Sequence, residues 1–218
     1  MIHIGEKLRT ARLRQNMSLR ELAEKAEVSA SLLSQIENGK ANPSVRSIYS
    51  IAAALALPTN YFFPDGEEAE ENPEETLEVG QMTASAVRAL QTEGRIEESD
   101  LFQDHPHRSK GPVVCRNARG RIELMGGVTW ERLTPGREEN IEFMEIRYEV
   151  GANSGAKMSR HNGREFGLIL AGELTVELGF ESYVLRAGDS ITFDSIVPHR
   201  MINSGSVPVQ AVWVVLDR

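Results

Sequence analysis

The 218-residue sequence is poor in the features that mark secreted and membrane proteins. Cys115 is its single cysteine, so the chain cannot form an internal disulfide and lacks the cysteine pattern of an oxidising compartment. The first thirty residues lack the continuous apolar segment of a secretory signal. The longest apolar run, Ile51–Leu57, is far shorter than the roughly 20 residues that cross a bilayer. We therefore expect a cytoplasmic protein without a membrane partner.

Aromatic residues are few, at 6%, but the 40% hydrophobic and 26% charged residues are an ordinary globular composition. This composition excludes collagen-like, coiled-coil and wholly disordered chains. At about 100–200 residues per domain, the length fits one large domain or two small ones. If it were evenly spread, the net charge of −8 would argue against DNA binding, because duplex affinity depends largely on basic side chains that neutralise phosphates.

The negative charge is concentrated in one short segment. Residues 1–63 carry eight basic and five acidic residues, whereas residues 64–80 carry eight acidic residues and no basic one. The remaining segments, 81–111 and 112–218, have net charges of only −1 and −2. A Glu-rich segment with Pro and Gly has little to bury and is typical of a solvated linker. We therefore predict a basic domain over 1–63, an acidic linker and connector over 64–111, and a second domain over 112–218.

The first 63 residues have the signals of five short helices. Ser18 stands three residues before Glu21, which is the spacing of a capping box. Ser29 is expected to cap the next helix in the same way, Asn38-Gly39 to end it, and Pro43-Ser44 to open a fourth helix. A first helix is expected from about residue 4, and a short fifth one over residues 58–63.

From residue 113 the apolar period changes from helical spacing to two. Met144, Ile146 and Tyr148 alternate with charged residues, and Leu174, Val176 and Leu178 repeat the alternation. Turn signals recur between such segments. Many short strands at this spacing predict an antiparallel β-barrel or a double-sheet sandwich. The fold class is thus multi-domain α + β.

The N-terminal domain resembles the phage-repressor-like (XRE-type) helix-turn-helix family over nearly all of residues 4–63. The matching residues are Arg12, Ser18-Leu19-Arg20-Glu21-Leu22-Ala23, Val28-Ser29, Leu33-Ser34-Gln35-Ile36-Glu37-Asn38-Gly39, Pro43-Ser44 and Ile51-Ala52. The second helix of this motif lies in a DNA major groove. The resemblance implies a double-stranded DNA operator as partner. The alternatives are a basic solvated face or a helical module that binds protein.

The resemblance also assigns roles to individual residues of this domain. The residues expected to face the groove are Ser29, Ala30, Ser31 and Gln35, and those expected to meet phosphates are Arg20, Asn38 and Lys40. The amide of Gln35 suits an adenine edge. Leu19 stands where the family often has Gln, which removes one polar contact. Arg12 and Glu37 are expected to form an internal ion pair. With a charge of only +3, the domain should bind DNA as a homodimer that reads two half-sites.

The C-terminal domain contains residues spaced as a metal or ligand site. His161 and Glu165 are four residues apart, and His199 follows Pro198. On separate strands of a barrel, these residues could converge as a two-His, one-carboxylate set.

These residues resemble the two motifs of the cupin family. The matching positions are His161, Glu165 and Gly172 in the first motif and Gly188, His199 and Asn203 in the second. The resemblance implies an antiparallel β-barrel of the cupin (double-stranded β-helix) type. Ser159, Asn153, Asp194 and Ile196 depart from the family pattern, and Ser159 replaces one of four family ligands.

The three remaining ligands can hold a divalent metal with open positions, although the resemblance makes no cofactor obligatory. The alternative is a metal-free site in which His161, Glu165 and His199 bind each other, water or an organic effector. Arg160, Arg164 and Arg200 adjoin the two histidines in sequence. If Arg200 or a neighbouring arginine points inward, it would favour an anionic ligand.

Taken together, these features predict a sequence-specific DNA-binding transcriptional regulator, not an enzyme, whose cupin domain dimerises it and senses a small metabolite. One alternative is a metal-dependent cupin enzyme with a DNA-binding appendage. Ser159 argues against this alternative because it removes a ligand. A second alternative makes the cupin domain a dimerisation module without any ligand.

Overall fold

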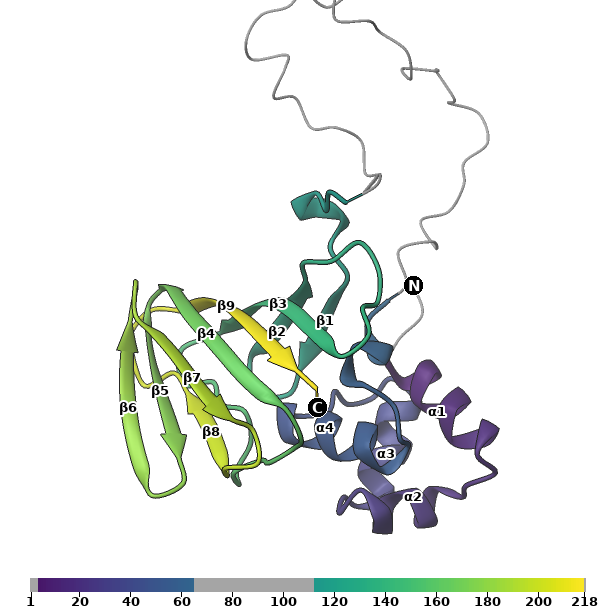
Figure 1. The fold of residues 1–218 in the computed structure, drawn as a ribbon. Coiled ribbons are helices and arrows are strands. Elements are labelled where there is room, and N and C mark those ends of the chain that lie inside the picture. Colours follow the sequence, from purple (N-terminus) through teal and green to yellow (C-terminus); the bar gives the residue numbers. More distant parts are fainter. Residues whose placement is uncertain (1–3, 65–111, 218) are drawn as a thin grey trace, which may run out of the picture.

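The computed structural model describes residues 4–64 and 112–217 (Figure 1). Helices occupy the first range and strands the second. Most of the predicted linker and connector, residues 65–111, lies outside the described residues. Within the described ranges, no helix is long and apolar enough to cross a membrane.

The first range, called the helical domain below, contains four α-helices and one 3-10 helix. Their bounds are α1 (Ile4–Arg14), α2 (Leu19–Lys25), α3 (Ala30–Glu37), α4 (Val45–Ala54) and η1 (Thr59–Phe62). The prediction of five helices was therefore wrong for the fifth, over residues 58–63, which is the 3-10 helix η1. Only four residues separate Pro58 from Phe63, and a segment this short closes as a 3-10 turn.

The predicted helix ends are confirmed. Ser18 and Glu21 form the reciprocal capping box at the start of α2. Ser29 caps α3 by accepting from the Leu32 N–H at 3.1 Å, and Ser44 caps α4 in the same way. Gly39 follows the C-cap of α3 at φ +66°, a left-handed conformation that glycine adopts without steric cost. Local sequence therefore fixes where these helices begin and end.

An internal ion pair ties α1 to the end of α3. Arg12 Nε and Nη2 donate to the two carboxylate oxygens of Glu37 at 2.6 and 2.9 Å. A third donor, Nη1, bonds the Met17 carbonyl at 2.8 Å. Both charged side chains are nearly buried, so the predicted pair is part of the domain's interior.

The second range, called the β-domain below, contains nine antiparallel strands in two sheets. The strands are β1 (Arg121–Leu124), β2 (Val128–Arg132), β3 (Ile141–Tyr148), β4 (Arg164–Ala171), β5 (Glu173–Leu178), β6 (Glu181–Arg186), β7 (Ser190–Asp194), β8 (His199–Ile202) and β9 (Val209–Leu216), after a 3-10 turn, η3 (Arg116–Ala118). One sheet has the order β1-β2-β3-β9-β4-β7 and the other β6-β5-β8. The predicted antiparallel β-structure is confirmed.

Alternation along the strands explains how the two sheets face a common interior. In β3, Met144, Ile146 and Tyr148 are almost fully buried, and the residues between them point outward. Side chains of successive strand residues point to opposite faces, so one apolar set packs between the sheets. Trp213 on β9 lies on the same buried side as Met144, its cross-strand partner.

The helical domain packs against the β-domain through α4 and its flanking residues, as Figure 1 shows. The Met125 N–H donates to the Pro43 carbonyl at 2.8 Å, and the Arg46 N–H donates to the Ser154 carbonyl at 3.1 Å. Further along, the Asn60 amide donates to the Glu138 carbonyl at 2.8 Å. These bonds place α4 over one end of the space between the sheets.

Candidate functional site

His161, Glu165 and His199 come together in the β-domain, as their spacing predicted. Glu165 is near the start of β4, His199 is the first residue of β8, and His161 lies in the loop before β4. Glu165 Oε1 is 3.0 Å from His161 Nε2 and 3.3 Å from His199 Nε2. Their candidate ligand atoms all lie within 4.8 Å of one another. Glu165 and His199 are buried, and only 11% of the His161 side chain is exposed.

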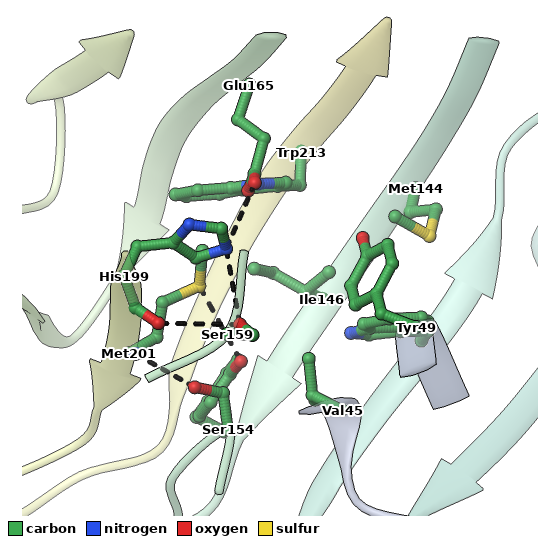
Figure 2. Close-up of a pocket in the computed structure, with 12 residues that line it drawn as sticks. Val45, Tyr49, Met144, Ile146, Ser154, Ser159, Glu165, His199, Met201 and Trp213 are labelled. Atoms are coloured by element: carbon green, nitrogen blue, oxygen red, sulfur yellow. Dashed lines mark hydrogen bonds and ion pairs between the residues drawn. The ribbon is translucent and has the colours of Figure 1, made fainter. Parts of the chain in front are cut away.

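Trp213 fixes the orientation of the carboxylate. Its indole Nε1–H donates to Glu165 Oε2 at 2.7 Å, and Figure 2 shows the two side chains next to each other. This bond leaves Oε1 for the two histidines. Gly167 is the cross-strand partner of Trp213, and a Cβ at position 167 would overlap the indole ring. Because Gly167 has no side chain, the Trp213 indole can pack directly against β4.

Both imidazoles are held by backbone carbonyls through Nδ1. The partners are the Asn162 carbonyl for His161, at 3.0 Å, and the Val197 carbonyl for His199, at 2.9 Å. Since each Nδ1 donates a proton, each Nε2 of a neutral ring presents a lone pair towards Glu165. Among the described residues, neither His161 Nε2 nor Glu165 Oε1 has a hydrogen-bond partner of good geometry. The arrangement calls for a proton or a cation at its centre.

The electrostatics of the three groups agree with this description. Burial lowers the pKa of His161, but the adjacent Glu165 outweighs burial and leaves that pKa above its ordinary value. For Glu165, burial raises the pKa, and contact with His161 and the charge of His199 bring it below its ordinary range. Burial keeps the pKa of His199 below its ordinary value despite Glu165. Of the two histidines, His161 is therefore the one whose charged form Glu165 favours over burial, as the opposite directions of the two pKa shifts show.

Ser159 lies beside His199, in the place of the fourth family ligand. The two residues exchange backbone hydrogen bonds of 2.9 Å, and Ser159 Oγ is 3.3 Å from His199 Nε2. A hydroxyl is a weaker metal ligand than an imidazole, and here it lines the same cavity as Glu165 and contacts His199.

A small cavity lies directly beside this cluster (Figure 2). Its volume, taken as the space open to the centre of a water molecule, is about 20 Å³. It is lined by Val45, Tyr49, Trp130, Met144, Ile146, Tyr148, Ser154, Ser159, Glu165, His199, Met201 and Trp213. This space holds about one water molecule or one metal ion.

Two lining residues come from the helical domain and were not foreseen from the sequence. Val45 and Tyr49 project from α4 into the cavity, as Figure 2 shows. The Tyr49 ring stacks on His161 with centroids 4.0 Å apart and planes at 6°, and it meets Trp130 edge-on at 5.7 Å. The sequence contained one weak signal for them. Ile48, Ile51 and Leu55 form the buried face of α4 within the helical domain, and Val45 and Tyr49 are apolar or aromatic residues that lie outside that face.

Arg200, expected as a contact for an anionic ligand, is not brought to the cluster. Its guanidinium pairs with Glu177 through bonds of 2.8 and 3.0 Å and does not line the cavity. Arg164 lies over the Phe166 ring, away from the cavity, because residues 164 and 166 are on the outer side of β4. Arg160 is exposed and lines a separate cleft next to α4.

Asn203, the last matching position of the second motif, supports the β-domain from outside the cavity. Its fully buried amide donates to the carbonyls of Tyr148, Glu149 and Val207 at 2.9–3.1 Å. It therefore joins the end of β3 to the loop that precedes β9.

The residues predicted to contact DNA lie around α2 and α3 of the helical domain. Arg20, Ser29, Ser31, Gln35, Asn38 and Lys40 are exposed, and Ala30 is half-buried. Two of them also have structural duties: Ser29 caps α3, and the Asn38 side chain donates to the Ser34 carbonyl at 2.7 Å. Gln35 has an exposed side chain on the outer side of α3, as a base-reading residue requires.

Comparison with known proteins agrees with both domains. Residues 8–62 match the helix-turn-helix family model, and residues 144–215 match that of the cupin domain. The HTH-type transcriptional regulator PuuR of Escherichia coli is 22% identical over 204 residues, which cover 93% of this chain and 88% of PuuR. The transcriptional regulator ClgR of Mycobacterium tuberculosis is 40% identical over 65 residues, 30% of this chain and 58% of ClgR.

A solved structure is similar in fold to this chain. It is the crystal structure of an HTH_3 family transcriptional regulator from Vibrio cholerae, with a TM-score of 0.59 and 20% identity. The match covers 99% of this chain and 95% of that one. The order of a helical domain followed by a β-domain is therefore shared with a known protein.

Proposed function

This chain is a helix-turn-helix transcriptional regulator that carries a cupin domain, and we propose that it reads a specific DNA operator as a homodimer and senses a small metabolite through the His161, Glu165 and His199 site. The domain division at 1–63, 64–111 and 112–218 is part of the proposal. So is the absence of an enzymatic reaction.

The observation that carries the DNA-reading role is the exposed, capped α3 within a helix-turn-helix match. Ser31 and Gln35 are exposed on this helix, and Ser29 and Ala30 start it. Arg20 and Lys40 flank it with positive charge, which suits phosphates on either side of a groove. The test is selection of bound fragments from genomic DNA by the full chain, followed by footprinting. Protection of two half-sites about one helical turn apart supports the proposal, and equal binding of all fragments contradicts it.

The dimer is supported by an apolar outer face on the larger sheet. Phe143, Phe166, Leu168 and Leu170 are 37–46% exposed there. Val214 is the cross-strand partner of both Phe143 and Phe166, so this apolar surface is continuous over β3, β9 and β4. Large exposed apolar patches mark interaction surfaces, and a two-fold axis lets one such patch cover its own copy.

The dimer can be tested by adding a charge to this face. We expect Leu168→Glu to convert a sedimenting dimer into a monomer, because a buried unpaired carboxylate is strongly unfavourable at an interface. Val184→Glu is the matched control, because Val184 is similarly exposed but lies on the smaller sheet. A wild-type monomer at micromolar concentration, or an unchanged mass for Leu168→Glu, would contradict this interface.

The site also fits a divalent metal ion. Ligands about 2.1 Å from a metal are roughly 3.0–3.4 Å apart at regular angles, and Glu165 Oε1 is 3.0 and 3.3 Å from the two Nε2 atoms. The carbonyl bonds of both Nδ1 atoms are the supporting contacts that metal-binding histidines usually have. His161, Glu165 and His199 would hold the ion, and Ser159 would lie beside it. A bound metal would supply positive charge for the polar part of an effector.

The sensing role can be tested by thermal shift with the full chain. Divalent metals, amino acids, polyamines and organic acids are screened one at a time, and hits are repeated with Glu165→Gln. A compound that stabilises the wild type and not this variant supports sensing at the site. Stabilisation by no compound, or equal stabilisation of both proteins by every hit, contradicts it.

A further inference from the structure

The candidate site is divided between the two domains by Tyr49. Beside the small cavity lies an open cleft of about 550 Å³ between α4 and residues 158–162. Tyr49 and Ser159 line both spaces, and His161 lines the cleft. The stacked rings of Tyr49 and His161 thus stand between the cleft and the buried carboxylate of Glu165.

The cavity behind Tyr49 is too small for a metabolite. Its volume of about 20 Å³ holds one water molecule or one ion. Pockets for organic ligands usually measure about 300–1,000 Å³. The other walls are buried side chains of the sheet core, such as Trp130, Met144 and Ile146. The wall formed by α4 is the one that can move without disturbing the sheets.

Helix α4 belongs to the core of the DNA-reading domain as well as to the cavity. Ile48, Ile51 and Leu55 are at most 2% exposed and lie in the helical domain, whereas Val45 and Tyr49 face the cavity. Because one short helix serves both sides, a displacement of α4 from the β-domain also moves the DNA-reading helices.

We propose that the helical domain is the lid of the cupin site: an organic effector reaches Glu165 only when α4 lifts Tyr49 off His161, so that effector binding and docking of the DNA-reading domain exclude each other. This inference rests on the proposed sensing function and specifies how it is regulated. A ligand that binds only the undocked form shifts the population towards it by its differential affinity, which alters the position of the DNA-reading helices.

The lid can be tested without knowing the effector, through the reactivity of the histidines. Diethyl pyrocarbonate modifies accessible imidazoles, and mass spectrometry reads His161 and His199 separately. In the wild type we expect both to react about tenfold or more slowly than free N-acetylhistidine. Tyr49 stacks on the His161 ring, and the two histidine side chains are only 11% and 4% exposed, so full access of the reagent needs a transient opening. Tyr49→Ala should accelerate His161 by about tenfold, and Tyr49→Phe should stay within about twofold of wild type because its ring still stacks.

Tryptophan fluorescence and thermal unfolding give a second measurement, which shows whether each variant is folded. The chain has two tryptophans, Trp130 and Trp213, and both line the cavity. Acrylamide should quench their fluorescence more strongly in Tyr49→Ala and in Tyr49→Leu, which retains apolar bulk, while the thermal transition stays cooperative. Wild-type histidine rates and quenching in both variants would overturn the proposal, and so would a wild-type protein as reactive as N-acetylhistidine.

The link to an effector is tested by hydrogen exchange of two amides that bridge the domains. The N–H groups of Arg46 and Met125 donate to carbonyls of the opposite domain. A compound found in the thermal-shift screen should raise their exchange about tenfold and bind more tightly to Tyr49→Ala than to wild type. Unchanged exchange with the compound bound overturns the lid proposal alone. If no compound binds even to Tyr49→Ala, the proposed sensing function is wrong. The histidine modification and fluorescence quenching experiments still test whether Tyr49 covers the site.

Discussion

The indole N–H of Trp213 holds one oxygen of Glu165 at 2.7 Å and thereby turns the other oxygen towards His161 and His199. Among the residues that the structure describes, this indole N–H and the two histidines are the polar contacts of the carboxylate. The bond from Trp213 converts a flexible acid into an oriented one, and the chemistry of the site depends on it.

If His161, Glu165 and His199 hold a metal as proposed, Trp213→Phe should weaken its binding while preserving the apolar packing of β9. Loss of a supporting hydrogen bond to a metal ligand typically lowers metal affinity about 10–100-fold. Loss of a hydrogen bond to a charged group should also cost about 1.5–3 kcal/mol of stability. Isothermal titration with Mn²⁺ or Zn²⁺ and urea unfolding measure the two effects. Wild-type metal affinity in this variant would mean that Glu165 needs no anchor.

Glu165→Gln should remove the response to metal or effector and leave operator affinity without ligand within about twofold of wild type, because Glu165 is a buried residue of the β-domain and adds no phosphate contact. Fluorescence anisotropy with an operator fragment and thermal shift measure these properties. Glu177→Gln is the control, since its partner Arg200 lies outside the cavity. Equal loss of both properties would make Glu165 a structural residue.

Gln35→Ala should cost about 1–3 kcal/mol at the cognate operator and relax specificity at one base pair, as expected for a lost contact to a base edge. Binding to the operator and to its single-base variants would be compared at one fixed salt concentration. Gln210→Ala, a change in the β-domain, serves as control. Unchanged affinity and an unchanged footprint would count against placing Gln35 in the groove.

Arg12→Ala should destabilise the helical domain by about 3–5 kcal/mol, because it leaves the nearly buried Glu37 carboxylate without its partner. Arg12→Lys should recover only part of this loss, since an ammonium cannot donate to both oxygens in the same forked geometry. Urea unfolding followed by circular dichroism at a helix-sensitive wavelength gives the values. A loss below about 1 kcal/mol would show that solvent reaches Glu37 freely.

Glu142 gives a prediction for the dependence of stability on pH. Burial raises the pKa of this carboxyl from 4.5 to about 7, although a hydrogen bond from Thr59 opposes the shift. The folded protein therefore retains a proton that the unfolded chain releases, and stability falls as pH rises from 4.5 to about 7. At about 1.36 kcal/mol per pKa unit, the loss reaches about 3 kcal/mol at most.

Glu142→Gln should remove this fall and be the more stable protein at pH 8. Urea unfolding at pH 5, 6, 7 and 8 measures it. The exposed Glu139→Gln is the control. If Glu142→Gln loses as much stability over this range as the wild type, another group is responsible for the dependence.

Local signals in the sequence were sufficient to predict the helical domain. The caps at Ser18, Ser29 and Ser44 depend on residues three positions away, and the Arg12–Glu37 pair follows from the family match. The alternation in β3 predicted its buried face in the same way. The exception was the segment Thr59–Phe62, which forms a 3-10 helix. A segment of four residues is too short for its sequence to decide between the hydrogen bonds of an α-helix and those of a 3-10 helix.

The surroundings of the site could not be predicted from short stretches of sequence, because they depend on contacts between residues far apart in the chain. Trp213 reaches Glu165 because β9 pairs with β4 in a register that places it opposite Gly167. Tyr49 reaches His161 because two domains pack together, more than a hundred residues apart in the chain. Arg200 is adjacent to His199 in sequence, yet strand alternation turns it to the opposite side, where Glu177 meets it.

Gly167 has a consequence for genetics. Gly167 lines neither the cavity beside Glu165 nor the cleft next to α4. Because any side chain there would push the indole away from β4, substitutions at Gly167 should yield a regulator that still occupies its operator but no longer responds to its effector. A selection for such unresponsive mutants should therefore recover changes at Gly167 alongside those at the two histidines.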